Sequence, residues 1–181
     1  MNPSLTETPA LSRRSVLKIG LCASAFLATA GLGASLSGCS SSTPASGFAL
    51  LRSSDLPFLR AVIPVLLEGV ASAQDIANGI EDTLKKLDFS LQRLSPEMFK
   101  LTQQLFDVLG MGITRGPLTG VWGSWENASG EQIRHFLHRW ENSYLNLLRM
   151  GQGSLLKLVI MAWYYQPAAW ANCGYPGPPK I

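Results

Sequence analysis

Cysteine and histidine are scarce in this chain of 181 residues, which contains 3 cysteines and 2 histidines. Cys22 lies within an N-terminal apolar run and Cys39 follows that run, so Cys173 is the cysteine that remains in the rest of the chain. A single cysteine there excludes an intrachain disulfide, a cysteine-based zinc site and a Cys-x-x-Cys-His haem attachment.

Charge is also limited, since Asp, Glu, Lys and Arg together make up 15% of the residues. Of the 15 basic and 12 acidic residues, three basic and one acidic precede Cys39, which leaves the remainder with a net charge near +1. No basic run or aromatic-basic motif is present, so we expect no nucleic-acid partner. The sequence also has no Gly-x-Gly-x-x-Gly, P-loop, nucleophile elbow or metal-binding cluster. We therefore expect a chain without a cofactor or a catalytic site of its own.

The first 38 residues have the order of an export leader: a charged region, an apolar run of 18 residues from Ile19 to Leu36, and a small-residue processing site. Residues 12–18 resemble a twin-arginine signal, with Val16 where that family usually has Phe. The resemblance implies recognition by the twin-arginine translocase, which exports proteins that are already folded, often with a cofactor inserted or a partner bound. The residues that carry it are Ser12, Arg13, Arg14, Leu17 and Lys18.

The end of the leader, Leu36-Ser37-Gly38-Cys39, resembles a bacterial lipobox. The resemblance implies cleavage before Cys39 and lipidation of its thiol, so that residues 39–53 form a lipidated, Ser-rich tether. Cleavage elsewhere and an uncut leader that acts as an anchor are the alternatives, because 18 apolar residues reach the lower edge of the roughly 17 to 25 that span a bilayer. We expect a membrane-anchored protein on the periplasmic side of a bacterial membrane, inner or outer.

Residues 54–165 carry the periodicity of amphipathic helices, which predicts an all-α fold: a single compact bundle of about five helices. The first expected helix follows Asp55 and has a kink or a stop beside Pro64, which lacks a backbone donor. The second covers residues 74–94, where Asp88-Phe89-Ser90 favours a break.

A third helix is expected from Pro96 to Gly110. Ser95 is a good N-cap, proline suits the first helical position, and glycine ends helices. Its expected buried side chains are Met98, Leu101, Leu105, Val108 and Leu109.

The fourth expected helix has the clearest signal, a capping box formed by Ser129 and Gln132. His135 and His138 project away from its apolar stripe. A solvated polar face explains them better than a metal site, because a zinc site needs three or four protein ligands and these histidines supply two. The expected buried stripe is Ile133, Phe136, Leu137, Trp140, Tyr144, Leu147 and Leu148.

A fifth helix, from Ser154 to Tyr165, is apolar almost all round, which is typical of a buried central helix. It is too short to cross a bilayer, and Pro167 is expected to end it.

Two segments lack periodicity. Residues 110–128 contain five glycines with Trp122 and Trp125, and we expect a long loop that is either functional or fastened to the core by its indoles. Residues 166–181 form an expected extended tail rich in proline and glycine, whose aromatic side chains dock on this domain or on another protein.

Several segments between Leu50 and Pro179 share the loose motifs of one family, namely 58–64, 122–125 with the helix that follows, 162–165 and 174–178. They resemble the gluconate 2-dehydrogenase subunit 3 type, the small subunit of membrane-associated flavin dehydrogenases. The resemblance implies a helical subunit without a cofactor, which binds and is exported with a large FAD-containing subunit of the glucose-methanol-choline (GMC) type. The lipobox and the short segment after Pro64 depart from that family, so a partner that oxidises an alcohol fits as well as one that oxidises a sugar acid.

Aromatic residues outside a clear core stripe are candidates for partner contact, because Trp and Tyr dominate interface hot spots. Our candidates are Trp122, Trp125, Trp163, Tyr164, Trp170, Tyr175 and Pro176.

The preferred hypothesis is therefore a non-catalytic accessory subunit of a periplasmic flavin dehydrogenase. The alternative is a free-standing helical lipoprotein that holds a small apolar ligand in a pocket lined by Trp122, Trp140 and Trp163. A third hypothesis, an enzyme that uses His135 and His138, has the least support.

Overall fold

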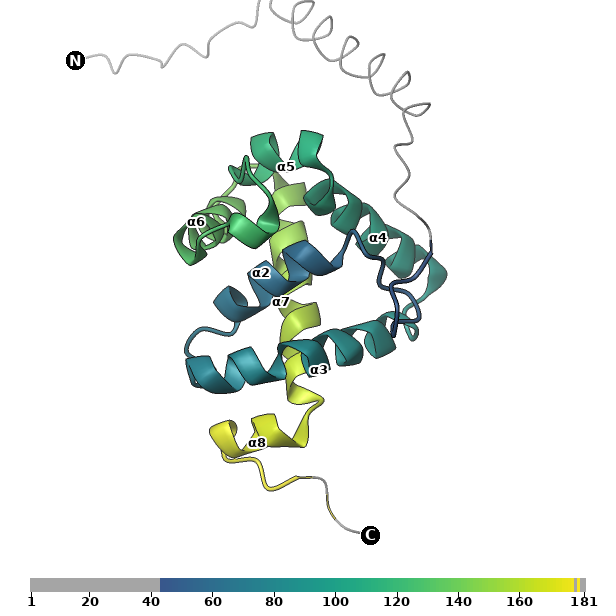
Figure 1. The fold of residues 1–181 in the computed structure, drawn as a ribbon, viewed down its shortest axis with the longest axis vertical. Helices are drawn as coiled ribbons and strands as arrows, with labels where there is room; N and C mark the ends of the chain where they lie inside the picture. The colour runs from purple at the N-terminus through teal and green to yellow at the C-terminus, as the bar shows by residue number, and fades with distance from the viewer. Residues whose placement is uncertain (1–42, 178, 180–181) are drawn as a thin grey trace, which may run out of the picture. The chain divides into compact units, whose positions relative to one another are not determined.

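The computed structural model describes residues 43–177 and Pro179, which belong to one compact unit (Figure 1). This part of the chain contains seven α-helices and one 3-10 helix, and no strand occurs among the described residues. The expected all-α fold is confirmed. The predicted leader of residues 1–38 and the predicted lipidation site Cys39 lie outside the described residues. The helices are α2 (Leu56–Leu66), α3 (Ala73–Leu91), α4 (Pro96–Gly110), α5 (Gly112–Thr119), η1 (Trp125–Asn127), α6 (Gly130–Glu141), α7 (Asn146–Tyr164) and α8 (Pro167–Cys173).

α2 runs through the middle of the bundle and contacts α3, α4, α6, α7 and η1 (Figure 1). A stop beside Pro64 is not observed, because the helix continues to Leu66. The backbone N–H of Leu67 donates to the carbonyl of Ile63 at 3.1 Å, so helical hydrogen bonding resumes directly after the proline. The side chains that α2 buries are Phe58, Leu59, Val62 and Ile63.

α3 and α7 are the two longest helices, with 19 residues each, and they pack against one another. The break expected at residues 88–90 is wrong, since α3 continues through them. α7 begins at Asn146, well before the predicted start at Ser154, and includes Gly151. A β-carbon at Gly151 would lie 3.0 Å from the indole of Trp140, so this glycine permits close helix packing and does not end a helix. No helix in the described part of the chain is long and apolar enough to cross a membrane.

α4 begins and ends where the sequence predicts, and the Ser95 hydroxyl accepts a hydrogen bond from the Met98 N–H at 3.3 Å. Its buried face is rotated from the expected one: Met98 and Leu101 are 51% and 58% exposed. Phe106, which was not assigned to the stripe, is buried because its ring packs edge-on against Phe58 at 5.1 Å. The side chains that α4 buries are Thr102, Phe106 and Leu109.

α6 has the predicted capping box, in which the Gln132 N–H donates to the Ser129 hydroxyl and the Ser129 N–H donates to the Gln132 side chain. The helix ends at Glu141, so the apolar stripe stops about two turns earlier than expected. Tyr144 and Leu147 fall beyond that end and are exposed. The side chains that α6 buries are Ile133, Phe136, Leu137 and Trp140.

The long loop expected at residues 110–128 is wrong over Gly112–Thr119, which forms α5. The glycines there have two other roles. A β-carbon at Gly116 would lie 2.6 Å from the indole of Trp122, and Gly120 ends the helix in a left-handed conformation with φ of 81°. The remaining loop returns to the core through Trp125, whose Nε1–H donates to the carbonyl of Leu109 at 2.8 Å.

The extended tail expected at residues 166–181 is wrong over Pro167–Cys173, which forms α8. The tail then turns back on itself, because Gly174 has φ of 70° and the ring of Tyr175 packs edge-on against Trp170 at 5.4 Å. The Nε1–H of Trp170 donates to the carbonyl of Tyr164 at 2.8 Å. Of the two interpretations of the tail, docking on this domain is the one observed.

Candidate functional site

The aromatic residues predicted to bind a partner fall into two classes. Trp125 and Trp163 are 2% and 4% exposed, so they belong to the core and offer a partner no surface, which makes that assignment wrong for both. The others retain exposed surface: Tyr164 and Trp170 are half-buried, while Trp122, Tyr175 and Pro176 are exposed. The exposed residues do not form one site, because Trp122 packs over α5 and the tail residues lie beside α8, at the opposite end of the molecule (Figure 1).

Most of the exposed large apolar side chains between residues 111 and 150 belong to α5, the loop after it, and the connection from α6 into α7, whose ribbons lie in the upper half of Figure 1. These elements are joined by the carbonyl of Leu118 on α5, which accepts hydrogen bonds from Arg139 and from the indole of Trp140 on α6. Gly151 on α7 then packs against the same indole. We call the exposed apolar side chains of these elements together the α5/α7 surface; they are Met111, Ile113, Trp122, Tyr144, Leu145, Leu147 and Met150.

Exposure on the α5/α7 surface is extensive. Ile113, Trp122 and Leu147 are 83%, 77% and 78% exposed, and Tyr144 is fully exposed. Sequence reasoning missed Tyr144 and Leu147 because they continue the apolar phase of α6 and were assigned to its buried stripe. Large apolar patches of this kind mark interaction sites in soluble proteins.

Arginines border the α5/α7 surface on all three helices. Arg115 belongs to α5, Arg139 belongs to α6, and Arg149 on α7 donates to the carbonyl of Ser143. The Nε atom of Arg115 is buried without a hydrogen-bond partner among the described residues. Tryptophan, tyrosine, methionine and arginine are the residues enriched at protein interfaces, so the composition of this surface suits a protein partner.

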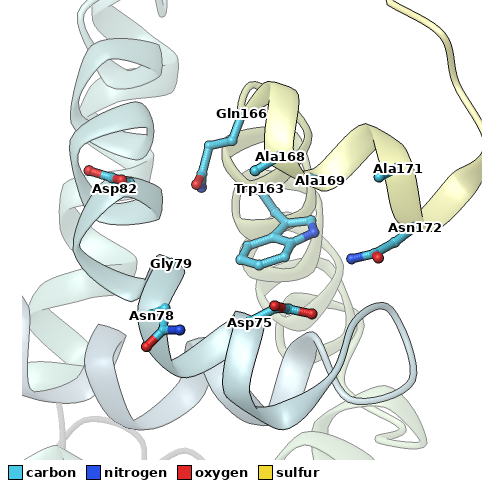
Figure 2. Close-up of a pocket in the computed structure, with 10 residues that line it drawn as sticks. All are labelled: Asp75, Asn78, Gly79, Asp82, Trp163, Gln166, Ala168, Ala169, Ala171 and Asn172. Atoms are coloured by element: carbon cyan, nitrogen blue, oxygen red, sulfur yellow. The ribbon is translucent and has the colours of Figure 1, made fainter.

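A pocket of about 410 Å³ opens between α3 and the junction of α7 with α8 (Figure 2). The indole of Trp163 lies against Gly79 of α3, where a β-carbon would come within 2.7 Å of the ring. Only glycine at this position lets the indole approach so closely. The pocket is lined by Asp75, Asn78, Gly79 and Asp82 on α3, by Trp163 and Gln166, and by three alanines and Asn172 on α8.

Five of the ten lining residues are polar, and these include two carboxylates but no lysine or arginine. Gln166 donates to the hydroxyl of Thr83 at 2.9 Å, which fixes its orientation. The Nε1–H of Trp163 has no hydrogen-bond acceptor among the described residues. The apolar pocket expected between Trp122, Trp140 and Trp163 is not formed, because Trp163 lies against α3 whereas Trp122 and Trp140 contact α5.

The histidines are both exposed on α6, as expected for a solvated polar face. His135 borders a shallow depression of about 250 Å³ together with Glu131 and Gly120. In the part of the chain that the structure describes, no group of three or more His, Cys, Asp or Glu side chains is arranged to hold a metal ion.

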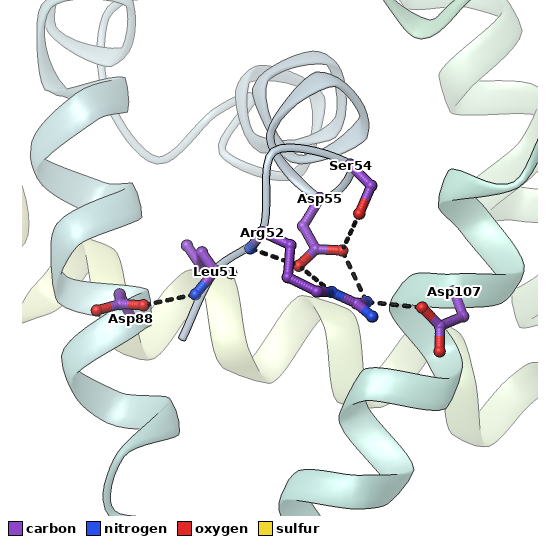
Figure 3. A network of polar contacts seen from close by, with 6 residues as sticks. All are labelled: Leu51, Arg52, Ser54, Asp55, Asp88 and Asp107. Atoms are coloured by element: carbon purple, nitrogen blue, oxygen red, sulfur yellow. Dashed lines mark hydrogen bonds and ion pairs between the residues drawn. The ribbon is translucent and has the colours of Figure 1, made fainter. Parts of the chain in front are cut away.

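The predicted tether of residues 39–53 is wrong from Thr43 onward, because these residues fold against the helices (Figure 3). Leu51 is fully buried, and the carboxylate of Asp88 on α3 accepts hydrogen bonds from the backbone N–H groups of Ala49, Leu50 and Leu51 at 2.8 to 2.9 Å. Asp88 thus takes the place of the missing backbone partners of this irregular segment.

Arg52 makes a second attachment for the same segment (Figure 3). Its buried guanidinium forms ion pairs with Asp55 at 2.9 Å and with Asp107 of α4 at 2.7 Å. The hydrogen bond to Asp55, with the negative charges of both aspartates, outweighs burial and raises the pKa of Arg52. The segment is therefore held on α3 by Asp88 and on α4 by Arg52.

Comparisons with known proteins were made at the level of family, sequence and structure. No protein-family model, curated protein or solved structure matches this chain. Any function proposed for the chain therefore depends on its predicted leader, its exposed apolar side chains and its pocket.

Proposed function

We propose that this chain is a non-catalytic accessory subunit of a periplasmic, FAD-dependent dehydrogenase of the GMC type, acting on an alcohol or a sugar acid. It binds the large subunit, accompanies it through the twin-arginine translocase and holds it at the membrane through a lipid on Cys39 or through an uncut leader. FAD is carried by the partner.

The α5/α7 surface is the observation that carries the proposal. Its most exposed side chains are Ile113 on α5, Trp122 in the loop after α5, Tyr144 between α6 and α7, and Leu147 in the first turn of α7. These side chains do not stabilise an isolated monomer in water. Complete burial of one Ile or Leu side chain in an interface would stabilise the complex by about 1.5 to 3 kcal/mol. The surface therefore fits a partner that is bound permanently.

The leader supports the same proposal. Arg13 and Arg14 imply a cargo that is folded before export, and this small helical domain has no evident need of that route for itself. A partner that must receive FAD before export has such a need.

The test compares two substitutions at opposite ends of α7. Leu147→Asp places a charge in the α5/α7 surface, and Met161→Asp places one at a similarly exposed apolar position about 21 Å away along the helix. We expect the large FAD subunit to co-purify with the wild type and with Met161→Asp, and not with Leu147→Asp. Flavin absorbance and dehydrogenase activity in the purified fraction are the readouts.

Export is the second readout. Deleting this chain, or replacing Arg13 and Arg14 by lysine, is expected to leave the dehydrogenase in the cytoplasm. Normal periplasmic dehydrogenase activity after the deletion, together with no flavoprotein bound to the wild-type chain, would reject the proposal.

A further inference from the structure

The pocket beside α8 has two features that its structural role does not require. The first is the negative charge of Asp75 and Asp82, since none of the residues that line the pocket is basic. The second is the indole N–H of Trp163, a residue that lines the pocket and is 4% exposed; this N–H donates to no acceptor among the described residues. An unmade hydrogen bond of a buried donor costs about 1 to 3 kcal/mol, so an incoming acceptor at this position would be stabilised.

The surroundings show which carboxylate is available. Asp82 lies 3.6 Å from Lys85, but both side chains are about two-thirds exposed, so this ion pair is weak. Asp75 accepts a hydrogen bond from the Ser72 hydroxyl at 2.6 Å and has no basic partner within the described residues. Asp75 is therefore the better anchor for an incoming positive charge.

Access to the indole nitrogen is controlled by Asn172. Figure 2 shows the Nε1 atom of Trp163 directed toward the Asn172 side of the pocket, with the carboxamide of Asn172 turned toward it. Asn172 lies on α8 and is exposed, so its side chain can rotate into solvent and let an acceptor reach the indole.

We propose that this pocket binds an organic cation that also carries a hydrogen-bond acceptor, such as an arginine or lysine side chain with its adjoining backbone carbonyl. The ammonium or guanidinium pairs with Asp75, the carbonyl oxygen accepts from the Nε1–H of Trp163, and the indole ring attracts the cation. The volume of about 410 Å³ is sufficient for one such side chain with its backbone. The proposal does not depend on the identity of the protein that occupies the α5/α7 surface.

The test titrates the full-length protein with N-acetylarginine methylamide while the indole N–H signals are followed by NMR; Trp163→Phe assigns the signal. The neutral control is N-acetylcitrulline methylamide, which has nearly the same shape and the same backbone acceptors. We expect saturable binding of the arginine compound with a downfield shift of the Trp163 signal, and binding of the citrulline compound that is at least tenfold weaker. Equal binding of the two compounds, or saturation without a shift of the Trp163 signal, would overturn the proposal.

Matched variants separate the site from general surface charge. Asp75→Asn should weaken binding about tenfold, whereas Glu97→Gln, which removes a first-turn carboxylate from α4, should leave it unchanged. Asn172→Ala should leave the Trp163 signal of the free protein in place or move it downfield, because Asn172 covers the indole without accepting from it and its removal admits water. An upfield shift in that variant, which reports a lost acceptor, would identify Asn172 as the acceptor and remove the basis of the site.

A short arginine peptide and free arginine amide distinguish the two sources of such a cation. Tighter binding of the peptide identifies a segment of a partner chain, and equal binding identifies a small molecule.

Discussion

Replacing Asp88 by alanine should lower the free energy of unfolding by about 3 kcal/mol. One carboxylate oxygen accepts from Leu50 and Leu51 at 2.8 Å, and the other accepts from Ala49 at 2.9 Å. Each hydrogen bond to a charged group contributes about 1.5 to 3 kcal/mol, and a buried N–H that loses its acceptor costs about 1 to 3 kcal/mol. Two of the three sites are only partly buried, where water can replace the carboxylate, and this brings the sum down to the stated value.

Asparagine at position 88 should cost about half as much. The side-chain carbonyl oxygen of asparagine can still accept from the N–H groups of Leu50 and Leu51. Its NH2 group, however, would face the Ala49 N–H, which is also a donor, and the negative charge is lost. The ordering of wild type, Asp88→Asn and Asp88→Ala is therefore a stricter test than either value alone.

Urea unfolding measures these differences, with Asp82→Ala as the control on the same helix. The Asp82 side chain is 65% exposed and its only ion pair is 3.6 Å long in the described structure, so we expect a change below about 0.5 kcal/mol. Hydrogen exchange should also show lost protection at Leu50 and Leu51 in Asp88→Ala, with α6 unaffected. An Asp88→Ala protein within about 1 kcal/mol of wild type and with unchanged protection at these amides would refute the reasoning.

Three further predictions concern other parts of the bundle. Gly79→Ala should destabilise the protein by about 1 to 3 kcal/mol, because the new β-carbon would lie 2.7 Å from a buried indole. Gly153→Ala, where no atom lies within 4 Å of the new β-carbon, should stabilise the protein by about 0.5 to 1 kcal/mol in thermal unfolding. Arg60→Met should raise the pKa of Glu81 toward its ordinary value of 4.5, because the hydrogen bond from Arg60 lowers that pKa in the wild type. The stability that this hydrogen bond contributes is present above pH 4.5 and is lost as the pH falls through the lowered pKa of Glu81. An NMR titration of the Glu81 carboxylate in both proteins measures the change. Ser129→Ala should cost about 1 kcal/mol in urea unfolding through loss of the capping box.

The starts of α4 and α6 could be predicted because their signals are local. Ser95 and Ser129 cap the N–H groups of residues three positions later, so the chemistry that begins α4 and α6 is contained within four residues of sequence. The buried face of α6 up to Trp140 follows from the same local periodicity.

The glycines could not be interpreted without the fold. Gly79, Gly116 and Gly151 each lie in a helix against a tryptophan ring, and in each case a β-carbon would come within 3.0 Å of that ring. Composition suggests flexible loops at residues 110–128 and 151–153, yet α5 and α7 pass through them. Glycine is tolerated there because the gain from close packing of an indole offsets its low helix propensity of about 1 kcal/mol.

The candidate site could be predicted only in part, for a related reason. Trp125 and Trp163 were assigned to a partner because they lie in or beside irregular segments, but long-range contacts with α2 and α3 bury them. Tyr144 and Leu147 were assigned to the core because they keep the apolar phase of α6, and the end of that helix at Glu141 removes them from it. Whether an aromatic side chain faces a core or a partner depends on where its helix ends and on what packs against it.

The folded segment from Thr43 changes what a lipid on Cys39 would do. Cys39 and Thr43 are four residues apart, so even a fully extended chain between them spans at most about 14 Å, which is half the length of α7. The domain would then stay close to the bilayer, and its partner would be held there with it. Asp88 holds residues 49–51, and release of the chain from residue 43 to residue 51 would add about 30 Å of possible reach. The buried carboxylate of Asp88 therefore contributes to stability and, if Cys39 is lipidated as proposed, also limits how far the domain can lie from the membrane.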